Sequence, residues 1–180
     1  MKYLLDACVL FPTVMREVLL AVAKTGVYEP VWSDRILEEW ALAARKLGPE
    51  GELQARAEIA LVNAAWPAAK VQSPDGLEDR LWLPDPSDIH VLASAIAGSA
   101  DGIITLNAKD FPRQILAEHG LSRVDADGFL LGIHKANPDI VSNAAEAVRQ
   151  KAEHLSGQPW EMRKLMKKAR LPRLGKALTR

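Results

Sequence analysis

Short apolar runs typical of buried strands alternate with longer segments of helical spacing along the first two thirds of the chain. Residues 2–6 form the first apolar run, which predicts a strand. Between Pro12 and Lys24 apolar residues recur three and four positions apart, which predicts a helix that ends at Gly26. The same reasoning predicts strands at 27–32, 69–72 and 102–106, and helices at about 34–47, 52–65, 86–98 and from Pro112.

This alternation indicates the α/β class, with a Rossmann-like parallel sheet flanked by helices. Beyond Val124 the pattern changes to two helical segments, 127–135 and 137–155, followed by a basic tail. We therefore expect an α/β domain over residues 1–125 and a C-terminal helical extension over 126–180.

The bulk composition is that of an ordinary globular protein. The chain has 180 residues, of which 48% are hydrophobic and 26% are charged. Its single cysteine, Cys8, excludes an internal disulfide and fits a reducing compartment. No signal peptide follows Met1, and no apolar run approaches the roughly 20 residues that span a bilayer. We expect a cytoplasmic protein that has no membrane partner.

The formal net charge of zero conceals an uneven distribution. Residues 161–180 carry eight bases and one acid, so the rest of the chain carries 15 bases and 22 acids. A basic tail on an acidic body suggests a polyanionic partner, although a solvated amphipathic end explains the same charges equally well. The bases that would contact such a partner are Arg163, Lys164, Lys167, Lys168, Arg170 and Arg173.

Several acids stand where predicted strands end or helices begin. Parallel sheets place ligands at the carboxyl ends of their strands, where Asp6 and Asp110 are expected. Asp6 also suits a turn, and Asp110 suits a helix cap. In the segment Asp85-Pro86-Ser87-Asp88, an Asp cap, a Pro and a first-turn acid make a good helix start without any other function, but Asp88 would also lie near the sheet edge.

The adjacent acids Glu38 and Glu39 differ in their expected surroundings. Ile36, Leu37 and Trp40 define the apolar face of their helix, and Glu39 lies nearer that face than Glu38. Glu39 is therefore the better placed of the two to join an internal cluster, with two surface glutamates as the alternative.

The kinds of side chain present limit which metal ion such a cluster could bind and which reaction it could support. The four histidines show no metal-ligand spacing, and no P-loop, dinucleotide fingerprint or nucleophile elbow is present. Carboxylates without thiols or paired histidines suit Mg²⁺ or Mn²⁺ better than zinc. A site of this kind supports metal-assisted attack on a phosphate.

The order of these acids, with the helix Asp88-x-x-Val91-Leu92-Ala93-x-Ala95 and the segment from Thr105 to Phe111, resembles the PIN domain, and more narrowly the VapC-type toxin ribonucleases. The resemblance covers residues 1 to about 125. It implies metal-dependent RNA cleavage with Mg²⁺ or Mn²⁺ as cofactor. By this resemblance the catalytic acids are Asp6, Glu39, Asp88 and Asp110. Asp6, Asp88 and Asp110 among them are the expected metal ligands, with Thr105, Asn107 and Asp85 in support.

Two departures accompany the resemblance. Cys8 stands where many PIN domains have a small hydroxylated or amide residue, and Asp85 competes with Asp88 as a metal ligand. The resemblance also implies a homodimer and a small inhibitory antitoxin, with RNA as substrate. One alternative is a non-catalytic PIN-like module that binds RNA or protein. A haloacid-dehalogenase-type phosphatase is disfavoured, because that family needs a second Asp where Cys8 stands.

Overall fold

A four-stranded parallel sheet positions the candidate site at one of its edges. The computed structural model describes residues 1–179, within which four strands form this sheet in the order β2-β1-β3-β4. β1 pairs in parallel with a neighbour on each side, so that Leu4 lies opposite Val31 and Ile103. The strands are β1 (Lys2–Leu5), β2 (Glu29–Val31), β3 (Gly102–Ile104) and β4 (Ser122–Val124).

The structure divides into two compact units. The first comprises Met1–Phe11 and Glu29–Arg123, and the second comprises Pro12–Tyr28 and the chain from Val124. The domain boundary near residue 125 stays a prediction. Helices of the first unit are α1 (Ala7–Leu10), α3 (Asp34–Ala43), α4 (Gly51–Ala65), α5 (Ile89–Ala97) and α6 (Arg113–Glu118), with short 3-10 turns η1 (Ala44–Leu47), η2 (Glu78–Arg80) and η3 (Pro86–Asp88). Helices of the second unit are α2 (Thr13–Ala23), α7 (Ala126–Ala136), α8 (Pro138–Ser156), α9 (Met162–Lys168) and α10 (Pro172–Ala177).

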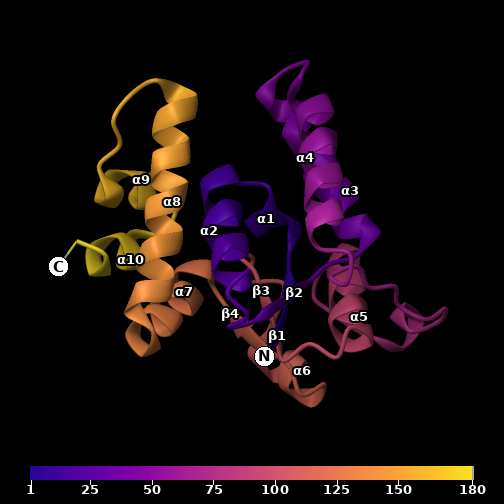
Figure 1. Ribbon diagram of the computed structural model, residues 1–180. Coiled ribbons are helices and arrows are strands. Elements are labelled where there is room, and N and C mark those ends of the chain that lie inside the picture. Colours follow the sequence, from indigo (N-terminus) through magenta and orange to yellow (C-terminus); the bar gives the residue numbers. More distant parts are fainter. Residues whose placement is uncertain (180) are drawn as a thin grey trace. The chain divides into compact units, whose positions relative to one another are not determined.

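Aliphatic side chains of β1 and β3 form the core of the first unit. Leu4, Leu5, Ile103 and Ile104 are fully buried, as the apolar runs predict. α5 packs on β1, and α3 lies beside α4 (Figure 1). The sheet edge that follows β1 and β3 is therefore held by a rigid core, which fixes the side chains that come next in the chain.

The predicted elements of the first unit are confirmed except at a few positions. The predicted strand 69–72 is wrong, since among the described residues this segment contributes one isolated bridge, between Lys70 and Trp32. The reason is that Ser33 accepts a hydrogen bond from Ile36 N and caps α3, so β2 has no further length to pair with. β4 was not predicted, because its three residues Ser-Arg-Val are largely solvent-accessible and carry no apolar run.

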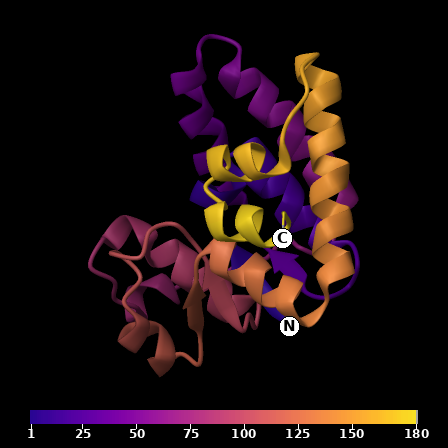
Figure 2. The same ribbon diagram turned by 90° about the vertical axis from the view of Figure 1, so that its left-hand side faces the viewer.

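The second unit is helical, and the predicted helices 127–135 and 137–155 correspond to α7 and α8. α8 packs against α2, α7 and α9, and Figure 2 shows α9 and α10 beside it. The basic tail is folded, because Leu165, Met166, Leu171 and Leu174 are buried. Within residues 1–179, no helix has the length and apolarity that crossing a membrane requires.

A buried carboxylate anchors α10 to α7. Asp127, only 6% exposed, accepts hydrogen bonds from Arg173 N at 3.0 Å, Arg173 Nε at 3.1 Å and Leu174 N at 2.9 Å. Arg173 also donates to Asp125 Oδ1 at 2.6 Å. The guanidinium of Arg173 thus has a structural function within this unit.

We predict that Asp127→Ala lowers the free energy of unfolding by roughly 2–4 kcal/mol, because three donors to a buried carboxylate lose their acceptor. Urea unfolding followed by circular dichroism measures the change. Asp75→Ala, at an exposed loop position, serves as the control and should change stability by less than about 0.5 kcal/mol. Equal stability of the two variants would contradict this function of Asp127.

Candidate metal centre

The parallel register of β1 and β3 places Asp6 next to Thr105. Leu5 lies opposite Ile104, and Asp6 N donates to Ile104 O at 3.1 Å, so the residues that follow meet at the same edge. Thr105 Oγ1 donates to Asp6 Oδ2 at 2.7 Å and accepts from Asn107 N at 2.9 Å. Asp6 and Thr105 are 7% and 3% exposed. A nearly buried carboxylate is thus held in one orientation.

Cys8 supplies a second hydrogen bond to Asp6. Its Sγ lies 3.1 Å from Asp6 Oδ2 as donor, 3.4 Å from Thr105 Oγ1, and accepts from Leu106 N at 3.2 Å. Burial and the neighbouring charge of Asp6 raise the pKa of the thiol to about 12, so it remains protonated. Cys8 can therefore donate to Asp6 as a hydroxyl would at this position.

The start of α5 contributes two further acids. Asp85 caps η3, since its Oδ1 accepts from Ser87 N at 2.9 Å and Ser87 Oγ at 2.7 Å. These hydrogen bonds, the side-chain one first, lower the pKa of Asp85. Asp88 follows one turn later, and Asn107 Nδ2 donates to its Oδ2 at 3.2 Å. The predicted helix start is confirmed, and Asn107 links it to the loop after β3.

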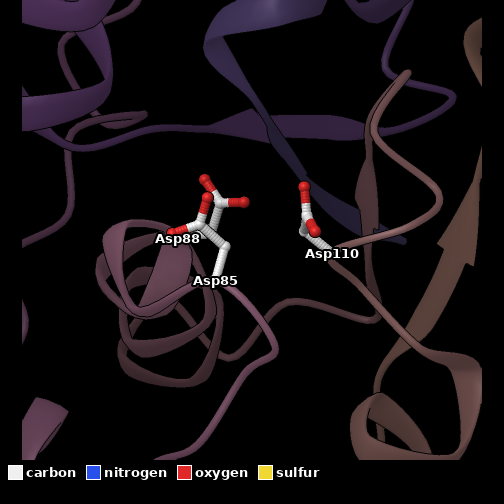
Figure 3. A group of neighbouring side chains, drawn as sticks. All are labelled: Asp85, Asp88 and Asp110. Atoms are coloured by element: carbon white, nitrogen blue, oxygen red, sulfur yellow. The ribbon is translucent and has the colours of Figure 1, made fainter.

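Three carboxylates form a group that could hold a cation. Among the described residues, Asp85, Asp88 and Asp110 each offer one oxygen, and these oxygens lie within 4.8 Å of one another. Figure 3 shows Asp85 and Asp88 at the start of α5, with Asp110 facing them from the loop after β3. All three are half-buried, so a cation there would still be open to water or a substrate.

Electrostatics connects the other acids to this group. The pKa of Asp88 is raised to about 6, first by its burial and then by the negative charges of Asp6, Asp85, Asp110 and Glu39. Asp6 and Glu39 are therefore close enough to Asp88 to disfavour its ionisation. A divalent cation would relieve this repulsion, which is an electrostatic reason for the site to bind one.

Glu39 reaches the site from α3. Glu38 points to solvent and accepts hydrogen bonds from Arg56 Nη1 and Nη2 at 2.8 Å and 2.7 Å, as the helical pattern predicts for the outer of the two residues. Glu39 is 38% exposed, and its Oε1 lies 2.7 Å from Nε2 of His90. His90 is 2% exposed. His90 was not predicted from the sequence as a residue of this site, and its position two residues after Asp88 was the available signal.

The basic residues considered from the sequence belong to the second unit. Arg163, Lys164, Lys167 and Lys168 lie on α9, Arg170 follows it, and Arg173 lies on α10. Lys164 pairs with Glu161 at 3.0 Å, and Lys168 Nζ lies 4.9 Å from the centre of the Trp160 ring. Their binding of RNA or of a protein stays a prediction.

The side chains of the acidic site that could ligate a metal ion are carboxylates and an amide. This set suits the hard cations Mg²⁺ and Mn²⁺, and the thiol of Cys8, with its high pKa, is no thiolate ligand for zinc. The residues present thus fit a divalent cation that Asp85, Asp88 and Asp110 would hold, whereas Asp6, expected from the sequence as a ligand, is not part of this group of three.

Comparison with known proteins relates the chain to a protein family. The family model described as PIN domain matches residues 2–109. No curated protein and no solved structure matches the chain. The matched residues contain Asp6, Glu39, Asp85, Asp88, Thr105 and Asn107, and they end one residue before Asp110.

We predict that the metal-free protein becomes more stable as the pH falls from about 6 to about 4. The pKa of Asp88 is raised to about 6 in the folded state, so the folded protein holds a proton that the unfolded chain, with the ordinary value of 3.8, has released. Asp88→Asn should consequently raise Tm at pH 8 and leave it nearly unchanged at pH 4. A change of about 1 kcal/mol corresponds to roughly 2–4 °C in a chain of this size.

We also predict that Mg²⁺ raises Tm of the wild-type protein at pH 8, because the ion binds the folded state and offsets the repulsion. The increase should shrink below pH 6, where Asp88 is protonated, and should be largely lost in Asp88→Asn. Differential scanning fluorimetry measures both effects, with Asp75→Asn as the control. A Mg²⁺ effect of equal size in Asp88→Asn would contradict the assignment of Asp88.

Proposed function

Because this chain belongs to the PIN-domain family, we propose that it is a Mg²⁺- or Mn²⁺-dependent endoribonuclease of the VapC toxin type. PIN-domain proteins are typically metal-dependent nucleases. The observation that carries the proposal is the group formed by Asp85, Asp88 and Asp110, whose oxygens lie within 4.8 Å of one another next to Asp6. The reaction is hydrolysis of a phosphodiester bond in RNA.

In this proposal some acids of the site bind the metal ion, and neighbouring side chains keep those acids in a fixed orientation. A bound divalent ion activates water and offsets charge on the scissile phosphate. Asp6, Asp88 and Asp110 would hold the ion. Asp6 is kept in one orientation by the hydroxyl of Thr105 at 2.7 Å, and Asp88 by the amide of Asn107 at 3.2 Å. Such fixed ligands lose little conformational entropy when the ion binds.

Glu39 and Asp85 have less direct functions in the same proposal. In this proposal Glu39, on the half-buried side of α3, would accept a proton from the attacking water or orient that water. Asp85 is already bound to Ser87 through Oδ1, which leaves its other oxygen for the ion or for an ordered water. Asp88 is therefore favoured over Asp85 as the principal ligand from this segment.

The proposed partners are RNA, a small inhibitory antitoxin and a second copy of the chain. A protein partner is supported by α4, where Leu53 and Leu61 are 67% and 72% exposed, and of whose fifteen described residues Ala55 alone is buried. Exposed large apolar side chains on one helix suit a protein interface better than contact with a phosphate backbone. The basic residues of α9 support contact with a polyanion or an acidic protein.

We predict that Asp6→Asn reduces RNA cleavage at least about 100-fold while leaving the fold intact, because one charge of the metal site is removed and both hydrogen-bond donors keep an acceptor. Cleavage of a labelled RNA under single-turnover conditions measures the rate. Asp101→Asn is the matched control, since Asp101 is exposed at the opposite end of β3 and binds Lys2 N. Equal rates in Asp6→Asn and wild type would remove Asp6 from the mechanism.

The decisive experiment for the function is incubation of total cellular RNA with the purified chain, without antitoxin. We expect discrete fragments with Mg²⁺ or Mn²⁺, none with a chelator and none with Asp88→Asn. A folded protein that binds RNA but cleaves none with either metal would instead identify a non-catalytic PIN-like binding module. The fragment ends would define the sequence or structure that is cut.

A further inference from the structure

A buried histidine lies against the acid that α3 contributes to the acidic site. His90, in the first turn of α5, is 2% exposed, and its Nε2 lies 2.7 Å from Oε1 of Glu39. Both of its ring nitrogens are buried, and within residues 1–179 neither makes an aligned hydrogen bond. Burial of polar atoms in this state is unfavourable, so His90 differs from an ordinary core residue.

The surroundings of the imidazole decide which of its nitrogens carries the proton. A proton on Nδ1 would be a buried donor that has no acceptor in the described part of the chain. The same proton on Nε2 faces a carboxylate oxygen at 2.7 Å, which is shorter than the roughly 2.9–3.0 Å of a usual N–H···O hydrogen bond. The structure therefore favours the form of His90 that has its proton on Nε2.

Glu39 is the partner that can move to complete this hydrogen bond. Its side chain is 38% exposed, whereas that of His90 is 2% exposed. The terminal torsion of a glutamate has a broad range, so a small rotation of the carboxylate brings Oε1 into line with the N–H. The buried imidazole is thus the fixed member of the pair, and the carboxylate turns to meet it.

The other base near Glu39 holds it less firmly. Arg35 Nε lies 4.0 Å from the same oxygen, Oε1, and Arg35 Nη1 lies 3.5 Å from Glu78. The Arg35 side chain is 54% exposed, and ion pairs of this kind are weak and are screened by salt. Both contacts of Glu39 are to Oε1, so Oε2 is the oxygen that can bind a water molecule.

Other acids of the site are held by a donor in the same way. Asp6 and Asp88 each accept a hydrogen bond from a neighbouring side chain, at 2.7 Å and 3.2 Å. Glu39 comes from a separate helix, and its negative charge adds to burial and to the other acids in raising the pKa of Asp88. An acid that reaches the site from another helix needs a donor of its own to stay in one orientation, and His90 supplies it.

We propose that His90 is a positioning residue for Glu39. The Nε2–H of His90 donates to Oε1 of Glu39, and this hydrogen bond holds Oε2 toward the water that attacks the phosphodiester. This role rests on the proposed nuclease function, and His90 acts through Glu39 without touching RNA. Loss of the imidazole would leave the carboxylate mobile rather than absent, so the chemical step slows while RNA binding is kept.

Three variants test this positioning through multiple-turnover cleavage of a labelled RNA that the wild-type protein cuts. His90→Leu, which removes the donor but fills the space, should lower kcat roughly 10–100-fold and change KM by less than about twofold. His90→Gln, which keeps an N–H near the position of Nε2, should restore most of kcat. His154→Leu, at an exposed position of α8, is the matched control and should leave both constants unchanged. Circular dichroism verifies that each variant is folded.

A measurement without RNA or metal tests the contact itself. Heteronuclear NMR of the metal-free, nitrogen-labelled protein should show a proton on Nε2 of His90 and an Nε2 resonance that moves in Glu39→Gln. A proton on Nδ1 alone, or no effect of Glu39→Gln, would overturn the positioning even if the protein cleaves RNA. So would equal losses of activity in His90→Leu and His90→Gln, or an undiminished effect of His90→Leu in a Glu39→Gln background.

Failure of the nuclease proposal gives a different result. Absence of RNA cleavage by the wild-type protein with Mg²⁺ and with Mn²⁺ would overturn the nuclease function and, with it, this function of His90, whatever the NMR spectrum shows.

Discussion

The parallel pairing of β1 with β3 is the constraint on which the acidic site depends. Because Leu5 lies opposite Ile104, the residues that leave the two strands must meet, and they are Asp6 and Thr105. A shift of one residue in this register would turn Asp6 away from Thr105 and the buried leucines toward the opposite face. The fully buried aliphatic core of the two strands makes such a shift costly, so the position of the carboxylate follows from packing.

Like charge is the second physical constraint on the site. The fold keeps Asp88 near four other carboxylates, those of Asp6, Asp85, Asp110 and Glu39, and their negative charges add to burial in raising the pKa of Asp88. Donors compensate in part, since Thr105 and Cys8 bind Asp6 and Asn107 binds Asp88. The remaining repulsion is a cost to the folded protein that a bound divalent cation would offset. The same feature thus reduces the stability of the metal-free chain and would favour the binding of a cation at this site.

Periodicity identified most of the fold, because strands that are buried on both faces and amphipathic helices leave clear patterns. It failed at Ala69–Gln72, where a strand-like sequence had no free strand to pair with, and at β4, whose residues lack an apolar run. Strand ends and helix starts also indicated Asp6 and Asp88. The contact of His90 with Glu39 depends on how α3 and α5 pack, and a single sequence does not encode that distance in any local pattern.

The second unit is assembled from two distant parts of the chain, since α2 precedes β2 but packs on α7 and α8. Val18, Leu19 and Val22 of α2 are fully buried. During synthesis, α2 leaves the ribosome before most of the sheet and well before the helices that cover it. The apolar face of α2 therefore stays exposed, or bound by a chaperone, until the last third of the chain has been synthesised. The C-terminal helices thus complete a folding unit begun near the N-terminus, and removing them would leave that early helix without its packing partners.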